Sequence, residues 1–377
     1  MTTTISTNQT ATFVANTANE TYLLLEGIRM VPTTGSAISA TAATGRNFII
    51  DGDVVATAAD AIAITGATGG SINTIHIGET GTVHGANGTG IDGSVGILNI
   101  FNDGFIEGQG AISTTASKTQ LANTGIIRST SASAILASNN LTLDNTGDII
   151  AQNADALTLT AGDHRIFNSG LISSQSDEHF AIAMDPGSFG FSLFENSGTI
   201  MGHSLGFQGS SGTEDFFNTG LIVGNMDFGN GTDFYNSAGG RLKGNLEMGD
   251  GEDFITLTEG ASISGTITGG GGSDDYVIDS DDYSLSEDEL GGVDVVRSSV
   301  SFILGDHFEH LFLTGGGDIS GRGNAAGNEL TGNDGDNALF GRGGTDVLTG
   351  NDGADRFNGG SGSDSVSYLS AAGGVIV

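Results

Sequence analysis

Aspartates and glycines near the C-terminal end of the chain recur at a spacing that suits a divalent cation. Apolar residues stand nine positions apart from Leu330 to Val366, and the units between them read LTGNDGDNA, LFGRGGTDV, LTGNDGADR and FNGGSGSDS. In each unit an Asp or Asn follows a glycine by two residues. Calcium takes about six to eight oxygen ligands, and carboxylates and backbone carbonyls supply them. The tract therefore predicts a calcium-binding repeat of the nonapeptide type.

Each unit is expected to form a turn and a short strand. The inward apolar positions are Leu330, Leu339, Leu348, Phe357 and Val366. Two units complete a coil, which places Asp346 and Asp364 on one side and Asn337 and Asp355 on the other. Without a cation these carboxylates would repel one another at the coil spacing of about 4.8 Å. An acidic flexible linker is the alternative, but linkers do not keep an apolar residue at every ninth position.

Candidate calcium ligands come from two parts of the chain. Those in the nonapeptides are Gly332, Asp334, Gly335, Asn337, Gly341, Gly343, Asp346, Gly350, Asp352, Gly353, Asp355, Gly359, Ser361, Gly362 and Asp364. Upstream, GNGTDFY, GDGEDFI and GGGSDDY carry Asp233, Asp253 and Asp274, either as further ligands or as polar residues of surface turns. Asp215 in GTEDFF precedes them as a weaker candidate.

Residues 267–377 resemble the hemolysin-type calcium-binding (RTX) family of proteins that bacteria export by type I secretion. Beyond the nonapeptides, VDVVRSSVSFILGDHFEHLFLTG (293–315) and GRGNAAGNELTGN (321–333) are similar to the spacer between RTX blocks. The resemblance implies an extracellular location, calcium-triggered folding and ligands at the matched positions. Asn337 stands in place of an Asp and Arg342 in place of a Gly, so we expect weak or no binding at those turns.

A second repeat, N-x-G-x-I, runs through the middle of the chain. Its asparagines are Asn102, Asn123, Asn145, Asn168, Asn196 and Asn218, and weaker copies lie near 51–54 and 79–83. A period of about twenty residues indicates a solenoid. Apolar residues two before and four after each Asn predict a strand, a tight turn and a strand, with the Asn side chains stacked in a hydrogen-bonded ladder. One longer interval holds residues 181–194, expected to protrude as a loop.

The fold class predicted is all-β, a parallel β-solenoid (β-helix) followed by a calcium-binding RTX β-roll. We expect an N-terminal cap or irregular segment over 1–45, about ten solenoid coils over 46–265, a β-rich spacer over 266–318 and the roll over 319–377. Family members usually continue into another strand and a C-terminal export signal. This sequence stops at GGVIV (373–377), so it is either a fragment with a truncated roll or has an atypical signal.

Composition restricts the partners and the compartment. The chain has 64 Gly, no Cys and a formal net charge of −34, so we expect neither nucleic acid nor anionic membrane surfaces as partners. Its N-terminus lacks the basic and apolar regions of a cleavable signal peptide, and no apolar run is long enough for membrane insertion. We therefore expect an extracellular protein, secreted without a cleavable signal peptide and either free or retained at the cell surface.

The residues indicate binding and architecture more than catalysis. His307, Glu309 and His310 have the wrong spacing for a helical zinc pair, and we expect no serine nucleophile elbow. The favoured function is a calcium-folded structural, surface or adhesive solenoid whose partners are calcium and either a second copy, an extracellular polysaccharide or a cell surface. The alternative is a polysaccharide-modifying enzyme, of lyase or epimerase type, with an RTX tail.

Overall fold

The computed structural model describes residues 1–41, 45–66, 72–94 and 96–367, and every regular element in them is a β-strand. The strands pair in parallel, as expected for a solenoid. Two compact units are present, one made of Met1–Thr213 with Gly220–Met226 and the other of Glu214–Thr219 with Asp227–Val377. The described residues contain no helix long and apolar enough to cross a membrane.

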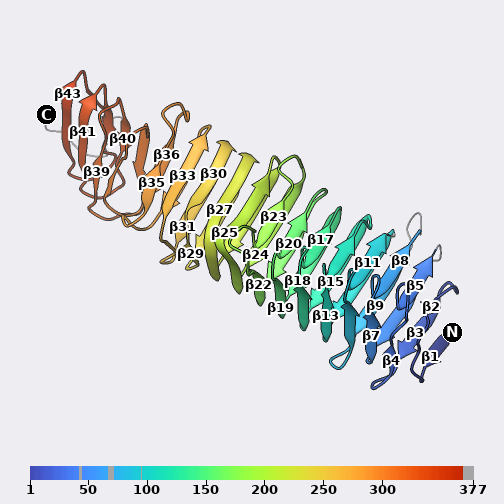
Figure 1. The fold of residues 1–377 in the computed structure, drawn as a ribbon. Coiled ribbons are helices and arrows are strands. Elements are labelled where there is room, and N and C mark those ends of the chain that lie inside the picture. Colours follow the sequence, from blue (N-terminus) through green and yellow to red (C-terminus); the bar gives the residue numbers. More distant parts are fainter. Residues whose placement is uncertain (42–44, 67–71, 95, 368–377) are drawn as a thin grey trace. The chain divides into compact units, whose positions relative to one another are not determined.

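Most coils of the first unit have three strands, so equivalent strands form three parallel stacks (Figure 1). The first stack is β1 (Thr2–Ile5), β3 (Thr21–Leu24), β6 (Asn47–Ile50), β9 (Ile72–Ile77), β12 (Ile97–Asn102), β15 (Lys118–Asn123), β18 (Asn140–Asn145), β21 (Arg165–Asn168) and β24 (Phe191–Asn196). The second is β4 (Arg29–Met30), β7 (Asp53–Ala56), β10 (Thr82–Gly85), β13 (Phe105–Gly108), β16 (Ile126–Ser129), β19 (Asp148–Ala151), β22 (Leu171–Ser174) and β25 (Thr199–Ser210). The third is β2 (Phe13–Val14), β5 (Ile38–Thr41), β8 (Ile62–Thr65), β11 (Ile91–Ser94), β14 (Ile112–Thr114), β17 (Ile135–Ala137), β20 (Leu157–Leu159) and β23 (Ile182–Met184).

The N-x-G-x-I repeat forms the predicted strand, turn and strand of these coils. Its flanking apolar side chains, which are at most 2% exposed, are Ile100, Leu121, Leu143, Ile166, Phe194, Phe216, Ile106, Ile127, Ile149, Ile172, Ile200 and Ile222. The glycine is required because the preceding coil passes close by: a β carbon on Gly125 would collide with the Gly104 carbonyl oxygen. The repeat therefore specifies both the core and the spacing between coils.

The predicted asparagine ladder is present in the first unit. Each Nδ2 donates to the Oδ1 of the next coil, from Asn102 to Asn123 at 2.7 Å and then through Asn145, Asn168 and Asn196 at 2.8 Å per step. These side chains are at most 3% exposed. Because a buried amide without a partner costs about 1–3 kcal/mol, the ladder makes a polar residue tolerable in the core at every coil.

Two expectations for the first unit need correction. In place of an irregular segment over 1–45, the described residues form β1–β5, and β1 pairs with β3 as regular coils do. Its role as a cap stays a prediction. Residues 181–194 are not one loop, because they contain β23 and the start of β24. The extra residues of this longer interval lie in the connections on either side of β23, where the chain departs from the core.

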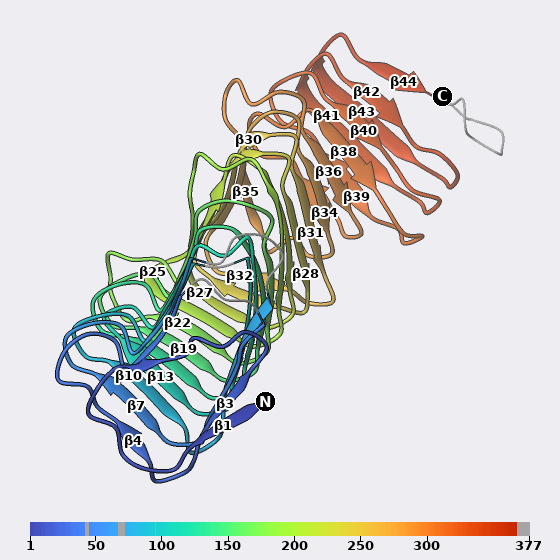
Figure 2. The ribbon, with the colours of Figure 1, turned by 90° about the vertical axis from the view of Figure 1, so that its right-hand side faces the viewer.

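Strands of the second unit form a long stack and shorter ones (Figure 2). The long stack is β26 (Thr213–Asn218, whose first residue belongs to the first unit), β28 (Phe234–Ala238), β31 (Phe254–Thr258), β34 (Asp275–Ile278), β36 (Val295–Ser298), β38 (His310–Leu313), β40 (Glu329–Thr331), β42 (Val347–Thr349) and β44 (Ser365–Ser367). The others are β27 (Leu221–Gly231, divided between the units), β30 (Leu246–Gly251), β33 (Thr266–Gly271) and β35 (Ser284–Ser286); β29 (Arg241–Lys243) and β32 (Ser262–Ile263); and β37 (Phe302–Ile303), β39 (Ser320–Arg322), β41 (Ala338–Gly344) and β43 (Arg356–Gly362).

The C-terminal nonapeptides form a roll with one strand per unit. Leu330 is level with Leu348, and Leu339 with Phe357, so two units complete a coil of eighteen residues as predicted. Leu330, Leu339 and Leu348 are fully buried, whereas Phe357 is partly buried and Val366 is 39% exposed. Val366 is nevertheless level with Leu348 in the parallel pair of β42 and β44, so it keeps the predicted inward position in the last described strand. The expectations about residues 373–377 lie outside the described residues.

Candidate calcium centres

Acidic residues directly precede the strands of the long stack in the second unit. Asp233, Asp253, Asp274 and Asp294 stand immediately before β28, β31, β34 and β36, and all are at most 1% exposed. Their positions follow from register, since Phe254 is level with Asp275 and Asp275 with Val295. One buried carboxylate per coil therefore forms a column, which we call the carboxylate column.

Each coil of the carboxylate column orients the carboxylate of the next. The Asp233 backbone N–H donates to Asp253 Oδ1 at 2.7 Å, Asp253 N–H to Asp274 Oδ1 at 2.8 Å, and Asp274 N–H to Asp294 Oδ1 at 2.9 Å. Before them the Glu214 N–H donates to Asp233 Oδ1 at 2.7 Å. Glu214, not Asp215, thus occupies the equivalent place, because Asp215 is level with Phe234, one residue later.

The second oxygen of each column aspartate is buried without a hydrogen-bond partner. This holds for Oδ2 of Asp233, Asp253, Asp274 and Asp294. Burial raises the pKa of Asp233 to about 9 and that of each of the other three to about 6. An unpaired ionised carboxylate is costly away from water. The column therefore needs protons or cations, and carboxylate oxygens are donors that calcium prefers.

The roll repeats the hydrogen bonds from backbone N–H to carboxylate on both of its sides. Asp346 accepts the Asn328 N–H through Oδ1 at 2.8 Å, and its buried Oδ2 has no partner. Asp346 N–H donates to Asp364 Oδ1 at 3.1 Å, and Asn337 N–H donates to Asp355 Oδ1 at 2.9 Å. The residues thus lie on the two predicted sides. Burial raises the pKa of both Asp346 and Asp355, while Asp364 is exposed.

The first glycine of each nonapeptide faces the carboxylate or amide of its own unit. A β carbon on Gly341 would collide with Asp346 Oδ2 and with the Gly359 carbonyl oxygen of the next coil. Gly332, Gly350 and Gly359 stand in the same relation to Asn337, Asp355 and Asp364. Carboxylate and carbonyl oxygens thus converge where no side chain fills the space, which fits a calcium ion.

Most of the other nonapeptide candidates lie in the turns of the roll. Asp334, Gly335, Asp352 and Gly353 do so, whereas Gly343 lies in β41 and Ser361 and Gly362 lie at the end of β43. Asp334, Asp352, Gly353, Ser361 and Gly362 are exposed. Arg342, in place of a glycine, adopts a φ of 82°, in the left-handed region that side chains disfavour. All assignments of individual ligands stay predictions.

Sequence reasoning missed a group of three acidic residues that could hold a cation. Ligand atoms of Asp274, Glu287 and Asp294 lie within 4.8 Å of one another, and all three residues are buried. Asp294 could have been found, because it continues the series that ends at Asp274 after a further 20 residues and follows a glycine by two. Glu287 belongs to no repeat and carries no such signal.

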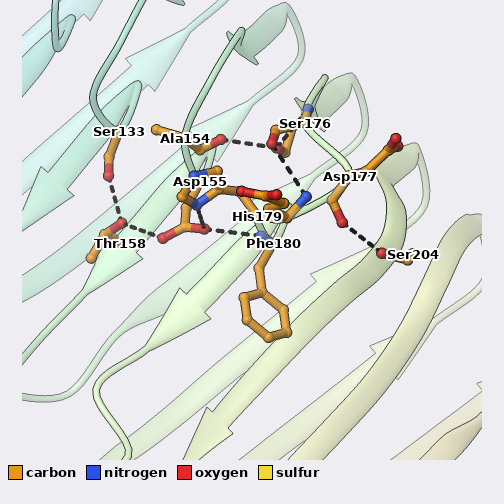
Figure 3. A network of polar contacts seen from close by, with 11 residues as sticks. Ser133, Ala154, Asp155, Thr158, Ser176, Asp177, His179, Phe180 and Ser204 are labelled. Atoms are coloured by element: carbon orange, nitrogen blue, oxygen red, sulfur yellow. Dashed lines mark hydrogen bonds and ion pairs between the residues drawn. The ribbon is translucent and has the colours of Figure 1, made fainter.

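A serine motif in the first unit tests the enzyme alternative. GHSLG (202–206) does have the G-x-S-x-G spacing, contrary to our expectation, but it lies in the extended strand β25 and not at a strand–turn–helix elbow. Ser204 Oγ donates to the Asp177 carbonyl oxygen at 2.8 Å (Figure 3). The G-x-S-x-G spacing is therefore present, but Ser204 does not have the geometry of a catalytic nucleophile.

The neighbouring histidine takes part in turn contacts of the same kind. His179 Nδ1 lies 3.3 Å from Asp155 Oδ1, which also accepts the Phe180 N–H at 2.9 Å (Figure 3). Asp155 Oδ2 accepts the Thr158 hydroxyl at 3.2 Å. In the described part of the chain this network connects turns of adjacent coils, and its hydroxyls bond to groups other than His179.

Comparison with known proteins agrees with the chemistry of the roll. Residues 331–366 match the model of the RTX calcium-binding nonapeptide repeat, in four copies. No curated protein and no solved structure matches the chain significantly.

Proposed function

Because residues 331–366 are RTX calcium-binding repeats, we propose that the chain is a secreted protein that folds on calcium outside the cell and serves as a structural, surface or adhesive solenoid. The observation that carries the proposal is the buried, unpaired Oδ2 of Asp346 within a repeat, together with the same feature along the carboxylate column. Without a cation the folded chain must protonate these groups or bury their charge, so calcium favours the folded state.

The free energy available from calcium is large enough for such a switch. Extracellular calcium modules bind at about 10⁻⁴–10⁻³ M. Raising free calcium from far below Kd to ten times Kd stabilises a folded protein by about 1.4 kcal/mol per site. Several sites together approach the roughly 5–15 kcal/mol that separates folded from unfolded domains. A chain with net charge −34 also loses self-repulsion when cations bind.

An architectural role is favoured over catalysis by how the described polar residues are used. The asparagine ladder and the turn contacts around Asp155 connect one coil to the next, and GHSLG lies in a strand. Solenoids expose long, regular strand faces that suit repeated contacts with a polymer, a surface or a second copy.

Calcium-triggered folding is tested by titrating the calcium-free full chain. We expect a rise in β-type circular dichroism and in melting temperature between about 0.1 and 1 mM calcium. Asp346→Asn should weaken the response, whereas Asp177→Asn, at a side chain that is 82% exposed, should not. Equal melting temperatures in calcium and in chelator would refute the switch.

Secretion and adhesion need separate measurements. Intact-mass analysis of the culture medium of the source cells should find a chain that retains its N-terminal segment. Detection in the cell interior alone would contradict secretion. For adhesion, the calcium-loaded chain should be retained on cells or extracellular polysaccharide and released by chelator. If the unfolded chain is retained on cells or polysaccharide equally well, the folded solenoid has no role in adhesion.

A further inference from the structure

We propose that Asp274, Glu287 and Asp294 form a discrete calcium site outside the matched nonapeptides, in which Glu287 is the residue that completes the site. The inference does not depend on calcium-triggered folding or on secretion. It concerns one cluster of the second unit and the chemistry of its oxygens.

The fold brings the three carboxylates together from two adjacent coils. Asp274 and Asp294 precede β34 and β36 and are level with each other, since Asp275 pairs with Val295. Glu287 directly follows β35, which pairs with β33 so that Thr268 is level with Ser286. One residue further on, Gly269 is therefore level with Glu287.

Hydrogen bonds hold Glu287 in place through both of its oxygens. Oε2 accepts the Gly270 N–H at 3.0 Å, and Oε1 accepts the Tyr276 hydroxyl. Glu287 is only 6% exposed. Donors directed at both oxygens orient the carboxylate, so it approaches the two aspartates in a fixed position.

Each aspartate of this cluster has one buried oxygen that receives no hydrogen bond. Oδ2 of Asp274 and Oδ2 of Asp294 are buried without a partner, while each Oδ1 is used by a backbone N–H. The ion pairs of the described residues include none of the three carboxylates. A bound cation would supply the missing positive charge.

The cluster is compact enough for its oxygens to share one calcium ion. Its three ligand atoms lie within 4.8 Å of one another. Oxygens on opposite sides of a calcium ion are about 4.6–5.2 Å apart, and calcium accepts irregular geometry where magnesium demands a strict octahedron. Gly269 leaves the space open, because a β carbon there would collide with Asp274 Oδ2, Glu287 Oε1 and the Tyr276 hydroxyl.

A shared proton is the competing account of the same cluster. It would relieve repulsion between the carboxylates without any metal, and it predicts that changing Glu287 leaves calcium binding unaltered. The two accounts therefore differ in one measurable quantity, the number of calcium ions bound by the full chain.

The test is calorimetric titration of the full-length chain with Ca²⁺ at pH 7.5. Glu287→Gln should reduce the stoichiometry by one ion relative to the unmodified chain. Glu289→Gln, the same change two residues away at an exposed position, should leave the stoichiometry unchanged. Asp346→Asn changes a nonapeptide, so its effect should add to that of Glu287→Gln. Equal stoichiometry and affinity in Glu287→Gln and the unmodified chain would overturn the proposal.

A spectroscopic measurement locates the site independently of folding. Tb³⁺ replaces Ca²⁺ and emits when a nearby tyrosine is excited, and the chain has no tryptophan. Tyr276→Phe should remove a component of the emission that Glu287→Gln also removes, with far-UV circular dichroism in calcium confirming the fold. Full emission in Tyr276→Phe would contradict a site beside this tyrosine. If the unmodified chain binds calcium but folds without it, the switch fails and this site stands.

Discussion

Asn337 and Asp346 occupy the same position in successive nonapeptides, yet only Asp346 keeps a buried oxygen without a partner. Asn337 accepts the Asn333 N–H through Oδ1 at 2.8 Å, and its Nδ2 donates to the Ile319 carbonyl oxygen at 3.1 Å. Asp346 accepts one N–H through Oδ1, and its Oδ2 is buried and unpaired. The Asn337 amide is thus hydrogen-bonded by protein groups alone, whereas the Asp346 carboxylate needs a cation.

This difference predicts the effect of Asn337→Asp. In chelator the variant should be less stable by about 1–3 kcal/mol, because it loses the Nδ2 donor and buries a charge. In millimolar calcium it should recover that stability and bind an additional ion. Urea unfolding with and without calcium measures both effects.

Asn358→Asp is the matched control for that variant. Asn358 is exposed in β43, so the same added charge should change stability little in either condition. A calcium-independent loss of stability in Asn337→Asp, with no added ion, would show that the carboxylate at this position does not recruit calcium.

The carboxylate column predicts opposite pH dependences for the calcium-free and calcium-loaded chain. Burial raises the folded-state pKa of Asp253, Asp274 and Asp294 to about 6 and that of Asp233 to about 9. The calcium-free folded chain thus holds protons more tightly than the unfolded chain. Its stability from these groups is full below about pH 4 and falls as pH rises through 6 to 9, by up to about 1.4 kcal/mol per pH unit for each titrating group.

Calcium should reverse that trend, because ions and protons compete for the same oxygens. Affinity should rise between pH 5 and 8, and binding near pH 6 should release protons. Melting temperatures in chelator and in calcium across this range check the signs. A calcium-free chain that gains stability from pH 5 to pH 8 would contradict the raised pKa values.

The asparagine ladder should contribute to stability without calcium. Asn145→Ala removes a donor to Asn168 and an acceptor for Asn123, and leaves their buried partners unsatisfied. We expect a loss of about 2–4 kcal/mol in the free energy of unfolding, equal with and without calcium. Asn139→Ala, at an exposed bond to the Thr115 carbonyl, should cost under about 1 kcal/mol. Equal losses in the two variants would remove the ladder as a stabilising element.

Arg342 predicts a stabilising substitution. At a φ of 82° the arginine backbone is strained by about 1–2 kcal/mol, and Arg342→Gly removes that strain. The greater freedom of glycine in the unfolded chain offsets about 0.4–1 kcal/mol, so the net gain should be up to about 1 kcal/mol. Thermal unfolding in calcium measures it. Arg356→Gly, at a residue whose own φ is not positive, should show no gain, and a comparable gain there would exclude strain as the cause.

The spacing of the coils and the burial of their apolar residues were predictable wherever one sequence motif repeats. Leu330, Leu339 and Leu348 are buried because each strand repeats the same inward position, and the Asn102–Asn196 ladder follows from its spacing. Asp215 was misplaced by one residue because two acidic residues precede the aromatic pair and spacing alone does not separate them. The domain boundaries at 45, 265 and 318 stay predictions.

Glu287 shows what spacing does not reveal. It is held by the Gly270 N–H and the Tyr276 hydroxyl, contacts that form only after the coils have stacked. No period connects it to Asp274, since it begins the irregular connection between β35 and β36. Ligands contributed by such connections depend on tertiary packing, whereas ligands within a repeat are visible in the sequence.

The side-chain amide dipoles of the asparagine ladder all have the same orientation. Each amide from Asn102 to Asn168 donates towards the C-terminal side, so their dipoles add, and Oδ1 of Asn102, at the start of the row, is buried and unpaired. Because each coil presents the next with the same acceptor, a duplicated or deleted coil would preserve this polarity. The ladder therefore permits the first unit to change in length by whole coils during evolution, while a single reversed amide would place two donors or two acceptors face to face.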